Sequence, residues 1–169
     1  MGVFLFTDGS VNPQQGVGFG AYIAFMKEPE NIGDLSECIK IKKFENTSST
    51  KLELQTILWA LSEIPEREVT SFTDSQNIVG LISRKERLVE NNYCSKSGRQ
   101  ISNHELYKEF FECTLRFTLQ FHHIKGHKPT KIKHRLDEIF TLVDRASRNA
   151  LRSYSKNKFQ SIAENDPTH

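Results

Sequence analysis

Short apolar runs and alternating stretches along the chain predict five β-strands. Each is rich in β-branched and aromatic residues, and most are flanked by glycine, proline, asparagine or serine, a pattern typical of strands. The second stretch is interrupted by glycines, which let another part of the backbone approach closely. The expected strands cover residues 3–7, 16–25, 37–44, 69–73 and 115–124.

Apolar positions that recur every three or four residues predict helices between these strands. The clearest apolar stripe lies in residues 50–64, and Ser48, Ser49 or Thr50 can cap this helix at its N-terminus. The other expected segments are a helix at 75–82, a basic loop or protrusion at 84–100, a helix at 103–113, a long helix within 130–154 and a polar, frayed tail at 156–169.

This order of elements predicts a single α/β domain, spanning residues 1–155, built on one mixed sheet flanked by helices. A chain of 169 residues is long enough for one domain with a real core, but not for two. A helix between the first and fourth strands would make them parallel neighbours. Their C-terminal ends would then lie side by side, where open α/β sheets bind ligands.

Two aspartates occupy matching positions at those strand ends. Asp8 directly follows residues 3–7, and Asp74 directly follows residues 69–73. Strand alternation places Asp8 on the face of Phe4 and Phe6, and Asp74 on the face of Phe72. If these phenylalanines face a core, two carboxylates crowd together on a buried side, where a metal ion is the natural compensating charge.

A third acid, Glu53, lies on the expected helix 50–64. It precedes Ile57 by one turn and Ala60 by two, so it points along the packing face instead of into water. With Asp8 and Asp74 it makes a plausible metal-binding set, although either aspartate alone is also a common turn residue.

The net charge of +2 conceals an asymmetry between the two halves of the chain. Residues 1–80 carry 6 Lys and Arg against 11 Asp and Glu, whereas residues 81–169 carry 17 against 10. Basic clusters beside an acidic pocket suit a protein that grips a phosphate backbone. The clusters are Arg84, Lys85, Arg87, Lys96 and Arg99 around Tyr93, then Lys125, Lys128, Lys131, Lys133 and Arg135, and finally Arg145, Arg148, Arg152, Lys156 and Lys158.

Composition predicts a cytoplasmic location. No apolar run approaches the length needed to span a bilayer, and the N-terminus lacks the basic and apolar regions of a secretory signal. The three cysteines show no metal-type spacing and are odd in number, so we expect reduced thiols rather than a disulfide framework.

Four motifs carry a family resemblance. They are TDGS at residues 7–10, SSTKLEL at 48–54, TDSQ at 73–76 and IKGH at 124–127. In this order they resemble type I ribonucleases H, over roughly residues 1–152. The resemblance implies a ribonuclease H-like fold whose five-stranded mixed sheet has its first three strands antiparallel. It also implies endonucleolytic cleavage of the RNA strand of RNA–DNA hybrids, leaving 5′-phosphate ends.

The resemblance implies a role for each matching residue. Asp8, Glu53 and Asp74 would bind two Mg²⁺ ions, with Mn²⁺ as a substitute, since all-oxygen ligands suit these ions and disfavour zinc. One ion would activate a water and the other would stabilise the leaving 3′ oxygen. His127 would be the loop histidine that assists proton movement or product release.

Hybrid-binding positions are implied at Gly9 and Gln76. The family's asparagine pair before the helix glutamate is replaced here by Ser49 and Thr50, whose hydroxyls can still hydrogen-bond sugars. The partner implied is an RNA–DNA hybrid, with no membrane and no obligate protein partner, and the protein would act as a monomer.

The fourth metal-binding acid is a choice between Asp137 and Asp144. Asp137 follows His127 at the family's usual separation, and Asp144 better matches the family's small residues after the acid. Seven residues separate them, so both can lie on one helix face about 10 Å apart. We favour Asp144, because small residues after it would let the helix approach the sheet.

Two other functions remain open at this stage. One is a DNA-directed nuclease or resolvase of the same fold, which the altered hybrid-contact residues allow. The other is a catalytically silent hybrid-binding module, against which the presence of all the candidate acids counts.

Overall fold

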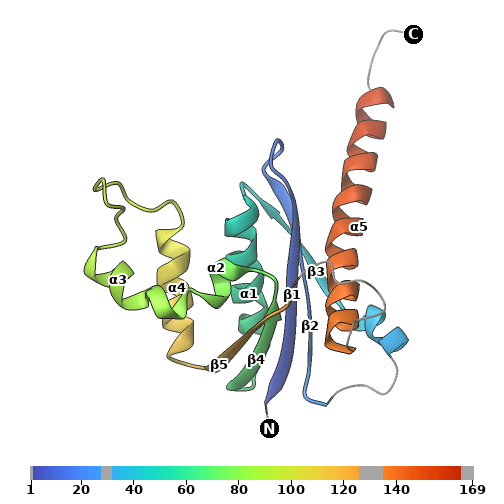
Figure 1. Cartoon of the computed structure of the whole chain (residues 1–169). Helices are drawn as coiled ribbons and strands as arrows, with labels where there is room; N and C mark the ends of the chain where they lie inside the picture. The colour runs from blue at the N-terminus through green and yellow to red at the C-terminus, as the bar shows by residue number, and fades with distance from the viewer. Residues whose placement is uncertain (1, 28–31, 126–134, 165–169) are drawn as a thin grey trace.

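The apolar segments pair into one five-stranded mixed sheet of order β3-β2-β1-β4-β5 (Figure 1). The computed structural model describes residues 2–27, 32–125 and 135–164. The strands are β1 Val3–Asn12, β2 Val17–Phe25, β3 Lys40–Glu45, β4 Glu68–Thr73 and β5 Thr118–His123. The helices are η1 Ile32–Cys38, α1 Ser49–Glu63, α2 Gln76–Val79, η2 Ile82–Arg84, α3 Lys85–Glu90, α4 His104–Thr114 and α5 Arg135–Glu164.

The strand directions confirm the predicted fold class. β1 pairs antiparallel with β2, which pairs antiparallel with β3. β4 is parallel to both β1 and β5. The first and fourth strands are therefore parallel neighbours, as the helix between them predicts.

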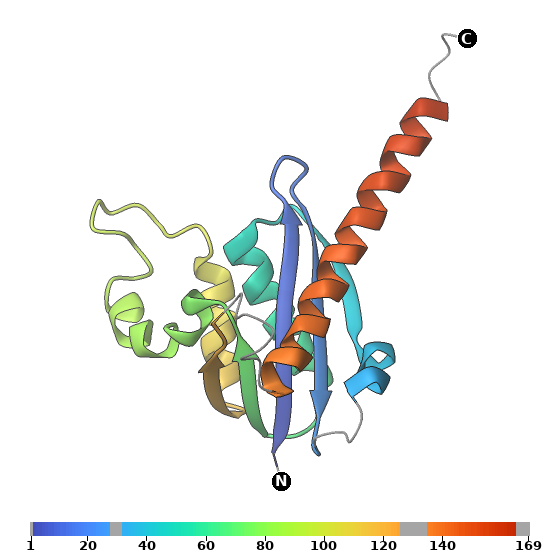
Figure 2. The same cartoon turned by 45° about the vertical axis from the view of Figure 1, so that its right-hand side comes forward.

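Helices cover both faces of the sheet, and successive residues of β1 point to opposite faces. Leu5 packs in a core with Ile57 of α1 and Phe110 of α4, whereas Phe6 packs in a second core with Val143 of α5. All five of these side chains are apolar and fully buried. Figure 2 shows α5 crossing the face of β1 and β2.

Several element boundaries differ from the predicted ones. β1 continues to Asn12, because it forms a hairpin with β2 that extends well past its pairing with β4. β3 begins only at Lys40, since residues 32–38 form a 3-10 helix. Leu115, predicted to start the last strand, is instead the C-cap residue that follows α4, and it is 78% exposed. Residues 156–164, expected as a frayed tail, continue α5.

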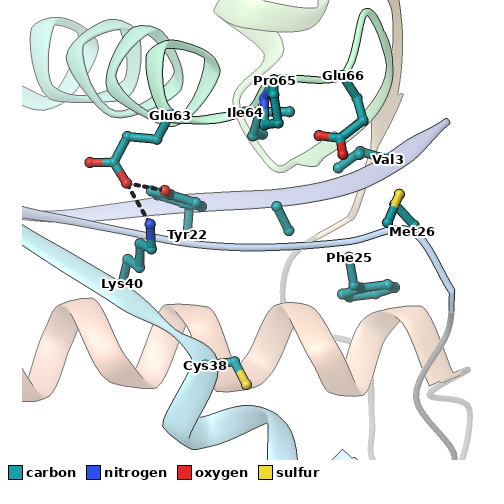
Figure 3. A pocket seen from close by; sticks show the side chains of 11 residues that line it. Val3, Tyr22, Phe25, Met26, Cys38, Lys40, Glu63, Ile64, Pro65 and Glu66 are labelled. Carbon is teal, nitrogen blue, oxygen red and sulfur yellow. Dashed lines mark hydrogen bonds and ion pairs between the residues drawn. The ribbon is translucent and has the colours of Figure 1, made fainter.

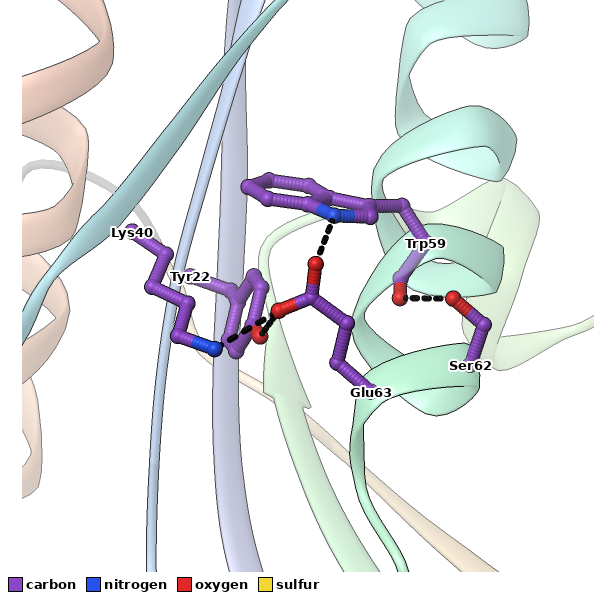
Figure 4. A network of polar contacts seen from close by, with 5 residues as sticks. All are labelled: Tyr22, Lys40, Trp59, Ser62 and Glu63. Atoms are coloured by element: carbon purple, nitrogen blue, oxygen red, sulfur yellow. Dashed lines mark hydrogen bonds and ion pairs between the residues drawn. The ribbon is translucent and has the colours of Figure 1, made fainter.

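A polar network fastens the end of α1 to the edge of the sheet (Figure 4). Tyr22 Oη and Lys40 Nζ donate to Glu63 Oε2 at 2.6 and 2.7 Å, and Trp59 Nε1 donates to Glu63 Oε1 at 2.7 Å. These donors lower the pKa of Glu63 to about 2. The network therefore holds in place the helix that carries Glu53.

A cavity of about 280 Å³ adjoins this network (Figure 3). Val3, Phe25 and Met26 contribute to its lining, which places it where β1 begins and β2 ends.

Within the described residues, no helix is long and apolar enough to cross a membrane.

Candidate metal centre

Asp8 lies two residues beyond the last parallel pair of β1 and β4, Phe6 with Phe72. It is inside β1, and not after its end as predicted, because the hairpin with β2 carries the strand onward. The two parallel strands therefore stop pairing just before Asp8, which leaves space between them at this level. Ser147 of α5 reaches that space and its Oγ lies 3.4 Å from Asp8 Oδ2.

The environment of Asp8 disfavours an unpaired negative charge. Burial, followed by repulsion from Asp74 and Asp144, raises the pKa of Asp8 to about 8, while the Gly9 N–H acts in the opposite direction. A carboxyl whose pKa is raised in this way gains most from a neighbouring cation. Three acids from β1, α5 and the end of β4 thus act on one another.

Asp74 directly follows β4 and interacts electrostatically with Asp8, Glu53 and Asp144. Burial, followed by repulsion from Asp144, raises its pKa, and the nearby His123 and Arg148 partly offset this effect. His123 Nε2 lies 3.1 Å from the backbone oxygen of Asp74. The imidazole therefore contacts the backbone of this residue and adds positive character near its carboxylate.

Glu53 approaches Asp8 and Asp74 from α1, which packs on the face of the sheet opposite α5. Its Oε2 accepts a hydrogen bond of 2.6 Å from Ser75 Oγ, and burial followed by repulsion from Asp74 leaves its pKa raised. Gly9 permits the approach of α1, because a Cβ at this position would lie 2.9 Å from the Leu52 side chain. The closeness expected at the glycines of the stretch 16–25 is present at Gly18, where a Cβ would lie 3.2 Å from the backbone oxygen of Ser10.

One small cavity brings three of the acids together. Its volume is about 10 Å³, about the space of a single water molecule. It is lined by Thr7, Asp8, Glu53, Thr56, Thr73 and Asp74. The donors around it are all oxygen atoms, the ligand type that Mg²⁺ and Mn²⁺ prefer.

These carboxylates fit a divalent cation in charge and chemistry. Among the described residues, however, no three His, Cys, Asp or Glu side chains stand close enough together to form a ready-made metal cage. Ser75 holds Glu53, Ser147 approaches Asp8, and Arg148 Nε lies 2.7 Å from Asp144 Oδ1. Binding an ion would require the carboxylates to turn from these partners toward the shared cavity.

The geometry distinguishes Asp144 from Asp137. Asp144 acts directly on both Asp8 and Asp74. Asp137 lies in the first turn of α5, nearly two turns earlier, and is only 8% exposed. Asp137 is thus a buried residue of the N-terminal turn of α5 and not a surface charge.

The remaining predicted positions differ in how closely they lie to the acids. Gln76 is the first residue of α2 and is exposed beside Asp74 and Ser75, and Ser49 and Thr50 begin α1 one turn before Glu53. His127 falls outside the described residues. The basic segment 84–100 contains α3, and Arg84 ties it to α2 by donating to the Asn77 side chain at 2.6 Å.

Sequence reasoning missed four side chains that contact these acids or their backbone: Ser75, His123, Ser147 and Arg148. Two of them carried a signal. Arg148 follows Asp144 by four residues, the spacing of a helical ion pair. Ser75 follows Asp74 directly and also caps α2, since its Oγ accepts from the Ile78 N–H. The contacts of His123 and Ser147 depend on how the elements pack and have no local signal.

Comparison with known proteins agrees with this architecture. The model of the RNase H family matches residues 1–147. The chain is 28% identical over 142 residues to a ribonuclease H of Chlorobium luteolum, covering 81% of this chain and 91% of the relative. It is 28% identical over 144 residues to a ribonuclease H of Chlorobium phaeobacteroides, covering 82% and 92% of the two chains. Against ribonuclease HI of Haemophilus influenzae it is 26% identical over 139 residues, covering 80% and 84%.

Proposed function

Because the chain belongs to the RNase H family and is a ribonuclease H enzyme, we propose that it hydrolyses the RNA strand of RNA–DNA hybrids with two divalent metal ions and leaves 5′-phosphate ends. The observation that carries this proposal is the convergence of Asp8, Asp74 and Asp144 from three separate elements, with Glu53 lining a cavity shared with two of them. The catalytic domain would span residues 1–155 and act as a monomer.

The proposed ligands are Asp8, Glu53, Asp74 and Asp144. When bound, Mg²⁺ or Mn²⁺ would supply Lewis acidity at the attacking water and at the leaving 3′ oxygen. Asp8 has the strongest need for a cation, because burial and repulsion from Asp74 and Asp144 raise its pKa to about 8. Asp144 supports this role from α5, where Arg148 holds its carboxylate in place.

Substrate contacts would surround these acids. Gly9 offers half-buried backbone next to Asp8. Ser49, Thr50 and Gln76 offer hydroxyl and amide groups at the N-termini of α1 and α2. The basic segment 84–100 would hold phosphates of the DNA strand. His127 would assist proton movement or product release.

A cleavage assay with labelled duplexes tests the proposal. An RNA–DNA hybrid, double-stranded DNA, double-stranded RNA and a four-way DNA junction are each incubated with Mg²⁺, with Mn²⁺ and with a chelator. We expect cleavage of the hybrid's RNA strand alone, dependent on metal and lost in Asp8→Asn. The control variant Glu105→Gln, an exposed acid of α4, should retain full activity. Cleavage of the junction or of double-stranded DNA instead would overturn the proposed substrate, and hybrid binding without any cleavage would overturn the reaction.

A further inference from the structure

The final helix α5 extends well beyond the sheet on which it packs. Its 30 residues correspond to about 45 Å at 1.5 Å per residue. Tyr154 still contacts the sheet, with its ring 5.7 Å from that of Phe19 and with Lys43 Nζ 4.6 Å from its centre. Beyond this point, both views show α5 continuing past the tip of the β1–β2 hairpin (Figures 1 and 2).

The segment of α5 from Arg145 to Lys158 carries charge of one sign. Between Arg145 and Lys158 there are five basic residues and no acidic residue. A helix face with no other role usually mixes the two signs. Four of the basic residues, which we call the α5 stripe, are spaced by three, four and four positions: Arg145, Arg148, Arg152 and Lys156.

The α5 stripe lies on one exposed side of the helix. At 100° per residue its four members fall within an arc of about 80°. All four are exposed, whereas Val143 and Ser147, on the opposite side of the helix, are fully buried. The stripe therefore faces solvent along several turns while the other face packs on the sheet.

The α5 stripe begins at the candidate metal centre. Arg148 pairs with Asp144, with Nε 2.7 Å from Oδ1, and its charge partly offsets the raised pKa of Asp74. Arg152 and Lys156 follow on the same side, one and two turns farther along the projecting helix. A polyanion whose reacting phosphate lies at the acids would thus meet a row of cations leading away from them.

Three of the four members of the α5 stripe follow the segment that the family model matches. The family match ends at residue 147, just before Arg148, Arg152 and Lys156. The relative from Chlorobium luteolum is covered over 91% of its length, but only 81% of this chain is covered. These three cations therefore follow the matched domain and can add a contact to its substrate.

We propose that the α5 stripe is a second binding surface for the phosphate backbone, which grips the hybrid on one side of the cleaved bond. The inference rests on the proposed function for the position of the substrate. From Asp144 to Lys156 the helix rises about 18 Å, the length of about five base pairs at 3.4 Å per pair. The surface thus extends the contact between the enzyme and the hybrid on one side of the cleaved bond. It belongs to a different part of the chain from the basic segment 84–100.

The test compares Arg152→Gln/Lys156→Gln with the wild type in hybrid binding and cleavage. Neither residue belongs to the proposed metal centre, and both are exposed, so the fold should persist, which circular dichroism and melting check. A duplex of about 18 base pairs is used for both measurements, and binding is measured with Asp8→Asn as the background so that cleavage does not interfere. We expect the Kd at about 0.1 M salt to rise about tenfold. The slope of log K against log salt should fall by about 1.8 in magnitude, because two phosphate contacts are lost and each contributes about 0.9. KM should rise with Kd, and kcat should change less than twofold.

Two further variants and a shortened substrate test whether the position of the basic residues or the total charge of the protein explains binding. Lys27→Gln/Arg67→Gln removes two exposed charges at the opposite end of the sheet, since Lys27 follows β2 and Arg67 precedes β4. It should bind like the wild type, as should the charge-retaining Arg152→Lys/Lys156→Arg. On a hybrid that extends only about two base pairs from the cleaved bond toward the stripe, too few to reach Arg152 and Lys156, the effect of the double variant should disappear.

The outcomes for this inference and for the proposed function are distinct. Equal binding and equal salt slopes for wild type and Arg152→Gln/Lys156→Gln would overturn the stripe while hybrid cleavage stood. Equal losses in the stripe variant and in Lys27→Gln/Arg67→Gln would also overturn it, because total charge alone would then explain binding. If no hybrid were cleaved, the proposed function would fail, and the salt slopes would still decide whether the stripe binds phosphates.

Discussion

The guanidinium of Arg148 lies 2.7 Å from the carboxylate of Asp144, measured from Nε to Oδ1, one helical turn apart on α5. This pair stands where the acids of the sheet meet the final helix, because Asp144 also repels Asp8 and Asp74. Arg148 therefore offsets part of the negative charge that gathers there. The balance between this arginine and the surrounding carboxylates governs how strongly the centre attracts cations.

Replacing Arg148 by glutamine should make the protein more dependent on divalent metal. Without the guanidinium, repulsion among Asp8, Asp74 and Asp144 is less compensated, so the metal-free melting temperature should fall by about 2–4 °C. For the same reason, the rise in melting temperature on adding Mg²⁺ should be larger than in the wild type. Thermal unfolding with a chelator and with a Mg²⁺ titration measures both effects. Arg145→Gln, which removes a neighbouring exposed charge, serves as the control; if it behaved in the same way, the ion pair would not be the cause.

The metal-free protein should lose stability as pH rises from about 5 to about 8. The pKa of Asp8 is about 8 in the folded protein against 3.8 for an ordinary aspartate. In this window the folded state holds a proton that the unfolded state has released, so the free energy of unfolding falls with increasing pH. At about 1.4 kcal/mol per pKa unit the effect should reach at least ~1 kcal/mol.

Melting temperatures at pH 5 and pH 8, in a chelator, measure this dependence. Asp8→Asn should reduce the dependence and should be more stable than the wild type at pH 8, since it removes the buried charge. Added Mg²⁺ should stabilise the wild type more at pH 8 than at pH 5, because metal competes with the proton. A wild type whose pH dependence equals that of Asp8→Asn would contradict the assignment.

Asp144→Asn and Asp137→Asn should have different consequences. We expect the first to reduce hybrid cleavage about 100-fold or more, since it removes a proposed ligand. The second should retain cleavage and lower the melting temperature, because Asp137 is buried in the first turn of α5. Steady-state cleavage rates and melting curves for both variants decide the matter. Retained turnover in Asp144→Asn together with lost turnover in a folded Asp137→Asn would assign the fourth acid to Asp137.

Gly9→Ala should weaken the protein through the packing of α1. The added Cβ would lie 2.9 Å from the Leu52 side chain, so the helix must shift, at a cost of about 1–3 kcal/mol. Cleavage should fall as well, because Glu53 follows Leu52 on the shifted helix. Leu52→Ala creates space at the same point, and the double variant should therefore show a favourable coupling in a double-mutant cycle. Denaturant unfolding measures it; additive losses would mean that Leu52 is not the residue that Gly9 accommodates.

Local periodicity in the sequence located most of the fold. Alternation in β4 and the apolar stripe of α1 are set by neighbours a few residues apart, so both elements were placed to within a residue or two. The end of β1 depends instead on pairing with β2, which adds strand where the local pattern shows none, and β3 starts later than predicted because residues 32–38 form a 3-10 helix. The prediction also ended α5 too early. The last turns of this helix project beyond the sheet, so they lack the regular apolar repeat by which helices are recognised in a sequence.

The sequence by itself determined the types of residue at the site and the order of the elements that carry them. Asp8 and Asp74 could be identified because they directly follow the apolar stretches 3–7 and 69–73, and Glu53 because the helix period turns it along the packing face of α1. Only the tertiary structure brings Asp144 into interaction with Asp8 and Asp74, because this depends on where α5 crosses the sheet. The contacts of Ser147 with Asp8, and of His123 with the backbone of Asp74, arise in the same way. Such contacts join residues far apart along the chain, and their distances follow from packing in three dimensions, which no local pattern encodes.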